Sequence, residues 1–345
     1  MNFQHFNYLY KEAQYDEIKV IGKDVQKEGK FYHVIGMTLK EKKAHLYVME
    51  LAESYCEKEP WREKTPRESM KETMEEDRNS SFFMHIREFR NKDMVYETEG
   101  AVSGVMEQGD FGEAYMLFVK MYEAGWRITE ESVFADVSWE RIALTKIELR
   151  NEYEALPQWS DDIEVMFMPV PVNEPIEKPV CLECGKNVEI DFSLKNGKGA
   201  TCYINKVELM DIWEKQEKKF SDSAYREKML QHVSEEELER MKQHFFEVLE
   251  EHCPKGKCYM TIEYECSEDV SLNFYDREYL DTLPKPNKGS ASALLMSVKP
   301  EKETGEHGYK LRGGVIQKPL DRNVKKMDAE LFSYVETVQK KIEKL

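Results

Sequence analysis

The stretch from Asn187 to Asn205 reads NVEIDFSLKNGKGATCYIN, and it carries the clearest structural signal in the chain. Every second residue of its first half is apolar: Val188, Ile190, Phe192 and Leu194. A β-strand places alternate residues on one face, so this half predicts a strand with one buried face. A turn centred on Asn196-Gly197 follows, and TCYIN returns as the partner strand. The stretch predicts an antiparallel hairpin.

The sequence that follows predicts one strong helix and a second hairpin. SEEELERMKQHFFEVLEEH (234–252) has apolar residues at helical spacing and opens with a capping box from Ser234 to Glu237. CYMTIEYEC (258–266) alternates like a strand, and DVSLNFY (269–275) is predicted to pair back on it.

The N-terminal half mixes strands and helices in the same way. Strands are predicted over residues 31–39, 43–51, 82–89, 94–106 and 163–170. A helix is predicted over 109–126, and T-P-R-E predicts a shorter one with Thr65 as N-cap and Pro66 at its first position. Because no strand–helix–strand rhythm appears, we predict an α+β fold of antiparallel sheets and hairpins with packed amphipathic helices.

A proline-rich run divides the chain. PVPVNEPIEKPV (169–180) holds four of the twelve prolines, which disfavour regular structure. At 345 residues the chain exceeds the usual size of one domain. We therefore predict an N-terminal α+β domain over 1–168, a linker over 169–180, and a C-terminal α+β domain over 181–345.

Charge and hydropathy exclude several classes of partner. The formal net charge is −17, and only residues 281–345 carry net positive charge, so we expect no nucleic-acid binding. No apolar run approaches the roughly 18 residues of a membrane span, and the start lacks the order of a signal peptide. Seven cysteines are an odd number for a disulfide framework. We expect a cytoplasmic protein with reduced thiols and no membrane association.

Four cysteines form the candidate metal site. Cys181 and Cys184 make a C-x-x-C-G turn, and Cys253 and Cys258 flank a Pro-Lys-Gly-Lys turn after the predicted helix. If the two turns meet, these sulfurs can bind Zn²⁺ tetrahedrally, with His252 as a substitute ligand. Reduced thiols that bind no cofactor and a redox pair are the alternatives.

Strand geometry excludes the remaining cysteines of this region from the zinc site. Cys202 is expected opposite Asp191 or Phe192, roughly 23 Å along the strand from Cys184. Cys266 lies eight residues from Cys258 on one strand, or roughly 26 Å away. Cys266 is expected to be a small core residue.

Carboxylates on two strands are a further candidate site. Glu189 and Asp191 share the outer face of one strand, and Glu263 and Glu265 share that of another. If the two hairpins are neighbours, the four groups can bind Mg²⁺ or Ca²⁺, or act as paired acid and base. Acids on the exposed face of an antiparallel sheet are more commonly its solvated side.

The last residues predict a C-terminal helix over 328–345. Its apolar residues follow a 4-3-4-3 spacing: Leu331, Val335, Val338, Ile342 and Leu345. We expect this helix to pack on its own domain and to be the route to a homodimer if the chain self-associates.

No phosphate-binding loop, dinucleotide motif, nucleophile elbow or H-E-x-x-H motif is present. We therefore predict a non-catalytic, acidic interaction or accessory protein that binds a protein partner. The alternative is a metal-dependent hydrolase that uses the cysteine cluster or the acidic strand faces.

Overall fold

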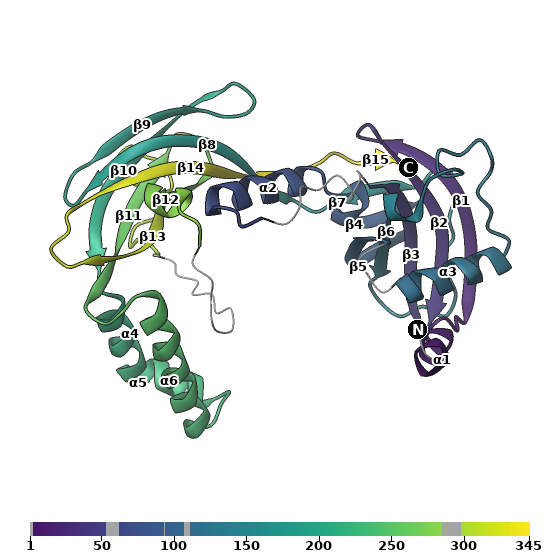
Figure 1. Cartoon of the computed structure of the whole chain (residues 1–345), viewed down its shortest axis with the longest axis horizontal. Coiled ribbons are helices and arrows are strands. Elements are labelled where there is room, and N and C mark those ends of the chain that lie inside the picture. Colours follow the sequence, from purple (N-terminus) through teal and green to yellow (C-terminus); the bar gives the residue numbers. More distant parts are fainter. Residues whose placement is uncertain (1–2, 53–61, 93, 107–110, 285–297) are drawn as a thin grey trace. The chain divides into compact units, whose positions relative to one another are not determined.

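The chain folds into two compact units, each with its own antiparallel sheets (Figure 1). The computed structural model describes residues 3–52, 62–92, 94–106, 111–284 and 298–345. Unit 1 comprises Met1–Arg62, Asp77–Val170 and Val338–Leu345, and unit 2 comprises Glu63–Glu76 and Pro171–Thr337. The mixture of helices and antiparallel sheets confirms the α+β class. Residues 63–76, which the predicted boundaries place in the N-terminal domain, belong to unit 2, and residues 338–345, which they place in the C-terminal domain, belong to unit 1.

Unit 1 is built on one antiparallel sheet with the strand order β1-β2-β3-β6-β5-β4-β7-β15. These strands are β1 (Glu17–Lys27), β2 (Lys30–Lys40), β3 (Lys43–Leu51), β4 (Ile86–Asn91), β5 (Met94–Val105), β6 (Ile142–Leu149), β7 (Glu164–Phe167) and β15 (Glu343–Lys344). Its helices are α1 (Phe3–Glu12) and α3 (Phe111–Glu123), with 3₁₀ turns at Phe82–His85 and Trp139–Arg141. The predicted start of α3, residues 109–110, lies outside the described residues.

Both faces of this sheet are covered, which explains its long buried strands. Eight consecutive residues of β2, from Tyr32 to Leu39, are buried. One face packs against the 3₁₀ turn that contains Phe82 and Phe83. The other face packs against α3 through Leu117 and Met121. Because α1 also packs on α3, the helical layer lies on this second face (Figure 1).

Unit 2 encloses its core between two sheets. The first has the order β13-β11-β10-β9 and the second the order β12-β14-β8. The strands are β8 (Val170–Glu183), β9 (Val188–Ser193), β10 (Gly199–Met210), β11 (Lys257–Cys266), β12 (Ser271–Asp276), β13 (Leu311–Asp321) and β14 (Lys326–Val338). Ile190 and Ile204 from the first sheet share this core with Leu331 and Tyr334 from the second. The alternating apolar residues of the predicted hairpin thus face the other sheet.

Three helices connect β10 to β11: α4 (Ile212–Ser221), α5 (Ser223–Leu230) and α6 (Glu235–His252). Ser234 caps α6 by accepting a hydrogen bond from the Glu237 N–H, which confirms the predicted start of this helix. Leu249 packs with Tyr259 of β11 in a small apolar cluster. The short helix α7 (Arg277–Asp281) follows β12.

Helix α2 (Pro66–Arg78) lies in the sequence between strands of unit 1, yet its first eleven residues belong to unit 2. The Thr65 N–H donates to the Glu68 carboxylate at 2.9 Å, and the Glu68 N–H donates to the Thr65 hydroxyl at 3.3 Å, which confirms the capping box. Met74 packs against Leu280 and Phe332. This contact joins α2 to the β12-β14-β8 sheet.

Three local predictions are wrong. The C-terminal helix is instead strand β14, followed by the short strand β15, and self-association through this segment stays a prediction. The proline-rich run 169–180 is largely strand β8 rather than an irregular linker. Strand β12 pairs with β14, not with β11, so the second predicted hairpin does not form.

Candidate functional site

The four cysteines of the predicted zinc site occupy different environments. Cys181 is exposed on β8, and Cys184 is half-buried against the core between the sheets. Cys253 ends α6 and packs in the helical cluster, whereas Cys258 is buried on β11. In the described part of the chain, no group of three or more His, Cys, Asp or Glu side chains is arranged to hold a metal ion. Zinc binding therefore stays a prediction that this geometry does not support.

The two buried thiols are poor nucleophiles in the metal-free chain. Burial raises the pKa of Cys253 and of Cys258 above the ordinary value for a thiol. Without a metal both groups are therefore protonated at neutral pH, whereas the thiolate is the form that attacks an electrophile.

The four carboxylates predicted on the strand faces do not gather. Strand β10 lies between β9 and β11, with Tyr203 opposite both Glu189 and Glu265. Two strand spacings separate the carboxylates of β9 from those of β11 by about 9.5 Å. Asp191 accepts a hydrogen bond from the Thr201 hydroxyl at 2.7 Å. A shared metal or an acid–base pair gains no support from this arrangement.

Glu265 differs from the other three because its carboxylate is completely buried. One oxygen, Oε1, accepts hydrogen bonds from the backbone N–H of His307 at 2.9 Å and from the Asn205 amide at 2.6 Å. The His307 ring nitrogen Nδ1 lies 3.0 Å from the same oxygen. The other oxygen, Oε2, accepts from the backbone N–H of Tyr309 at 3.0 Å. Burial alone would raise the pKa of Glu265, but these hydrogen bonds lower it to about 2.

The loop that covers Glu265 is shaped by glycine. The Gly305 N–H donates to the Tyr309 carbonyl at 2.9 Å, which closes a tight turn before β13. A Cβ atom on Gly305 would lie 2.4 Å from a Glu265 carboxylate oxygen, so a larger residue cannot fit at this position without movement. Gly308 has a φ of +86°, a conformation that residues with side chains rarely adopt. The loop therefore wraps the carboxylate closely.

The loop places two rings beside a ring of β10, and we call this group the aromatic face: half-buried Tyr203 with exposed His307 and Tyr309. The Tyr203 and His307 rings are stacked, with centroids 3.9 Å apart and an interplanar angle of 12°. Tyr309 lies parallel to Tyr203 at 6.3 Å and 5°. Tyr309 is 38% exposed, and the His307 side chain is 43% exposed. The hydrogen bonds to Glu265, which we call the clamp, thus hold His307 and Tyr309 beside the half-buried Tyr203 ring.

Two acidic side chains lie on the strands that flank Tyr203 of the aromatic face. Glu189 is exposed on β9 opposite Tyr203, and Glu263 is two residues before Glu265 on β11. Lys206 is opposite Glu263 and forms an ion pair with Glu208 at 3.0 Å.

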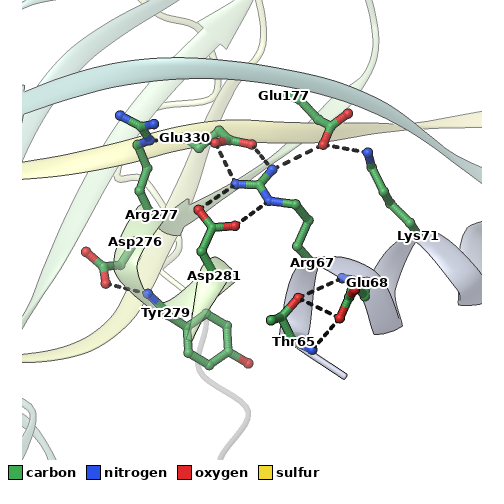
Figure 2. Close-up of polar contacts among 10 residues, drawn as sticks. All are labelled: Thr65, Arg67, Glu68, Lys71, Glu177, Asp276, Arg277, Tyr279, Asp281 and Glu330. Carbon is green, nitrogen blue, oxygen red and sulfur yellow. Dashed lines mark hydrogen bonds and ion pairs between the residues drawn. The ribbon is translucent and has the colours of Figure 1, made fainter. Parts of the chain in front are cut away.

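A second cluster of carboxylates in unit 2 is neutralised by arginine. Figure 2 shows Glu177, Asp281 and Glu330 directed at the Arg67 guanidinium, with contacts of 3.1, 2.7 and 2.6 Å. Lys71 of the same helix contacts Glu177 at 2.7 Å. Because the Glu330 side chain is only 4% exposed, this network holds α2 in place and leaves little room for a cation.

None of the three rings of the aromatic face was predicted as a site residue, and Tyr203 was predicted only as part of a strand. His307 and Tyr309 follow β11 by some forty residues, in a stretch that does not alternate like a strand. The signal present was turn chemistry, since Gly305 and Gly308 bracket a short polar run.

Comparisons with protein-family models, with curated proteins and with solved structures found no match. Among the described residues, none of the helices combines the length and the apolar character that a membrane span requires.

Proposed function

We propose that the chain is a non-catalytic interaction protein whose aromatic face binds a positively charged segment of a partner protein. The observation that carries the proposal is the set of three parallel rings, of which His307 and Tyr309 are exposed, with Glu189 and Glu263 on the strands that flank Tyr203. The proposed location is the cytoplasm, where thiols are kept reduced, and the six described cysteines form no disulfide with one another.

The chemistry of the face explains the preference for cations. Lysine and arginine side chains are attracted to the faces of aromatic rings by about 0.5–1 kcal/mol at exposed sites. Carboxylates nearby add a favourable and salt-sensitive attraction. An acidic segment meets like charge at the same place, so the face discriminates by charge.

Rigidity also favours binding. The His307 and Tyr309 backbone N–H groups are fixed on the buried Glu265 carboxylate, so these rings lose little freedom when a partner docks. On a preorganised surface of this kind, less of the free energy gained from each contact is offset by lost conformational entropy.

Fluorescence anisotropy with two labelled peptides tests the proposal. A lysine- and arginine-rich peptide is expected to bind the purified chain, and the same peptide with glutamate at the basic positions is not. Tyr309→Ala is expected to weaken binding roughly two- to five-fold, the equivalent of one exposed cation–ring contact.

Tyr279→Ala is the matched control, because Tyr279 is an exposed tyrosine of α7 in the same unit. It is expected to leave the affinity unchanged. The proposal fails if both peptides bind equally or if the two variants behave alike.

A further inference from the structure

Unit 1 contains a cleft of about 230 Å³ between its helices and the sheet. Leu9 of α1 and Leu117 of α3 contribute apolar walls, and Tyr47 of β3 and Lys146 of β6 lie on the sheet side. All these residues belong to unit 1, so the cleft is independent of the aromatic face. The volume is equivalent to about seven or eight water molecules, which suits a small ligand.

The floor of the cleft is uncharged but able to form hydrogen bonds. Burial and the neighbouring charge of Lys146 lower the pKa of His45 to about 4, so its imidazole is neutral at pH 7. Burial raises the pKa of Tyr47 and of Tyr15, so both phenols keep their protons. Thr38 donates a hydrogen bond to the Tyr47 hydroxyl at 3.3 Å, which fixes this ring on the sheet.

The rim of the cleft carries charges of both signs. Lys40 of β2 and Glu12 of α1 form an ion pair at 2.6 Å on one side. Glu113 of α3 and Lys146 of β6 lie elsewhere on the rim, and both are exposed. Glu113 is near enough to Tyr15 for its negative charge to help raise the pKa of that phenol. Besides the Lys40–Glu12 ion pair, the rim therefore carries one carboxylate and one ammonium group that can contact a ligand.

From this arrangement we infer that the cleft binds a small zwitterion with an apolar body, the chemistry of a free amino acid. Glu113 pairs with the ligand's ammonium group, Lys146 with its carboxylate, and the apolar walls contact its side chain. A simple anion is attracted to Lys146 but repelled by Glu113, and a simple cation meets the reverse. A zwitterion alone matches both rim charges and leaves the balanced cleft neutral.

Isothermal titration calorimetry of the full chain with free leucine and phenylalanine tests this inference. Each ligand is compared with its N-acetyl derivative and with its amide, which remove one charge at a time. The free amino acid is expected to bind at least ten-fold more tightly than either derivative. Equal affinity for a derivative overturns the inference, as does an absence of binding by all twenty amino acids at millimolar concentration.

Variants locate the site. Glu113→Gln and Lys146→Gln are each expected to weaken binding by roughly ten-fold, while Glu123→Gln, on the same helix α3 and paired with Lys120, leaves it unchanged. The His45 ring proton resonances report binding directly and are expected to shift on addition of the ligand. A ligand that binds without shifting them occupies another site, and this result also overturns the assignment.

Discussion

Glu265→Gln is expected to destabilise unit 2 by about 3 kcal/mol at pH 7. The folded pKa of Glu265 is about 2 against an ordinary value of 4.5, and each unit of difference corresponds to about 1.4 kcal/mol. Geometry gives a similar figure. A glutamine has one oxygen and one NH₂ group, so in either orientation the NH₂ faces a donor, and an unsatisfied buried group costs about 1–3 kcal/mol.

The effect has a defined pH dependence. Because the folded pKa of Glu265 lies below the unfolded one, its stabilisation is fully present above about pH 4.5 and is lost as the pH falls toward 2. The difference in the free energy of unfolding between the native chain and Glu265→Gln is therefore expected to shrink below pH 4.5. Urea denaturation at pH 7, 4 and 3 measures it.

Hydrogen exchange measures the same interaction locally. The amide protons of His307 and Tyr309 are bonded to Glu265, so both are expected to exchange faster in Glu265→Gln. Glu263→Gln, on the same strand and outside the clamp, is the control, with an expected change below about 0.5 kcal/mol. If the two variants are equally stable at pH 7, or if the amide protons of the loop exchange at the native rate in Glu265→Gln, then the hydrogen bonds to Glu265 do not stabilise unit 2 as argued.

Three further outcomes test the two units. The pKa of His45 is about 4 in the folded chain against an ordinary value of 6.5, so the free energy of unfolding is expected to fall by up to about 3 kcal/mol as the pH drops from 6.5 to 4. In His45→Gln the melting temperature is therefore expected to change less between pH 7 and pH 5 than in the native chain. Arg67→Ala leaves Glu330 buried without its main partner and is expected to lower the free energy of unfolding, measured by chemical denaturation, by about 3–5 kcal/mol. The double variant Arg67→Met, Glu330→Leu is expected to recover most of that stability. A double variant as unstable as the single one contradicts the role given to the ion pair. Iodoacetamide is expected to label exposed Cys181 in the native chain but to label Cys202 only after unfolding, because Cys202 is buried and burial raises the pKa of its thiol. Peptide mass spectrometry measures which cysteine is labelled.

The strands with one buried face were predictable from sequence. In β9, the alternation of apolar and polar residues matches the two faces of the strand. The register was less accessible, since Cys202 pairs with Ile190 rather than with the predicted Asp191 or Phe192. Register depends on the geometry of the turn, where Gly197 adopts a φ of +82°, and local hydrophobicity does not specify it.

Strand β14 was mistaken for a helix because it is buried on both faces. Six consecutive residues from Ala329 to Tyr334 are buried, so the two-residue alternation of a half-exposed strand is absent. Apolar residues four and three apart then imitate a helix. The β-branched and aromatic residues Phe332, Tyr334 and Val335 favour a strand, but the prediction gave more weight to the helical spacing than to these residue preferences.

Strand β8 was mistaken for a linker because its prolines were taken to exclude a strand. Pro171, Pro175 and Pro179 are all exposed, and β8 is the last strand of its sheet. Proline lacks the N–H that a neighbouring strand needs, so it is tolerated where one edge of a strand faces solvent. Residues four apart point their backbone nitrogen toward the same edge, so the spacing of Pro171 and Pro175 is consistent with an edge strand.

The two glutamates of β11 show why the candidate site itself was not readable from sequence. Glu263 and Glu265 are two residues apart on one face of a strand, and in sequence they are equivalent. The loop at Gly305–Tyr309, 40 or more residues later, covers Glu265 and gives it three of its four hydrogen-bonding partners, while Glu263 stays half-buried. A contact of that sequence separation leaves no trace in local periodicity. Under the proposed function, the buried carboxylate fixes the loop that carries His307 and Tyr309, while the half-buried one adds negative charge beside them, so the same residue type would serve two different roles at one surface.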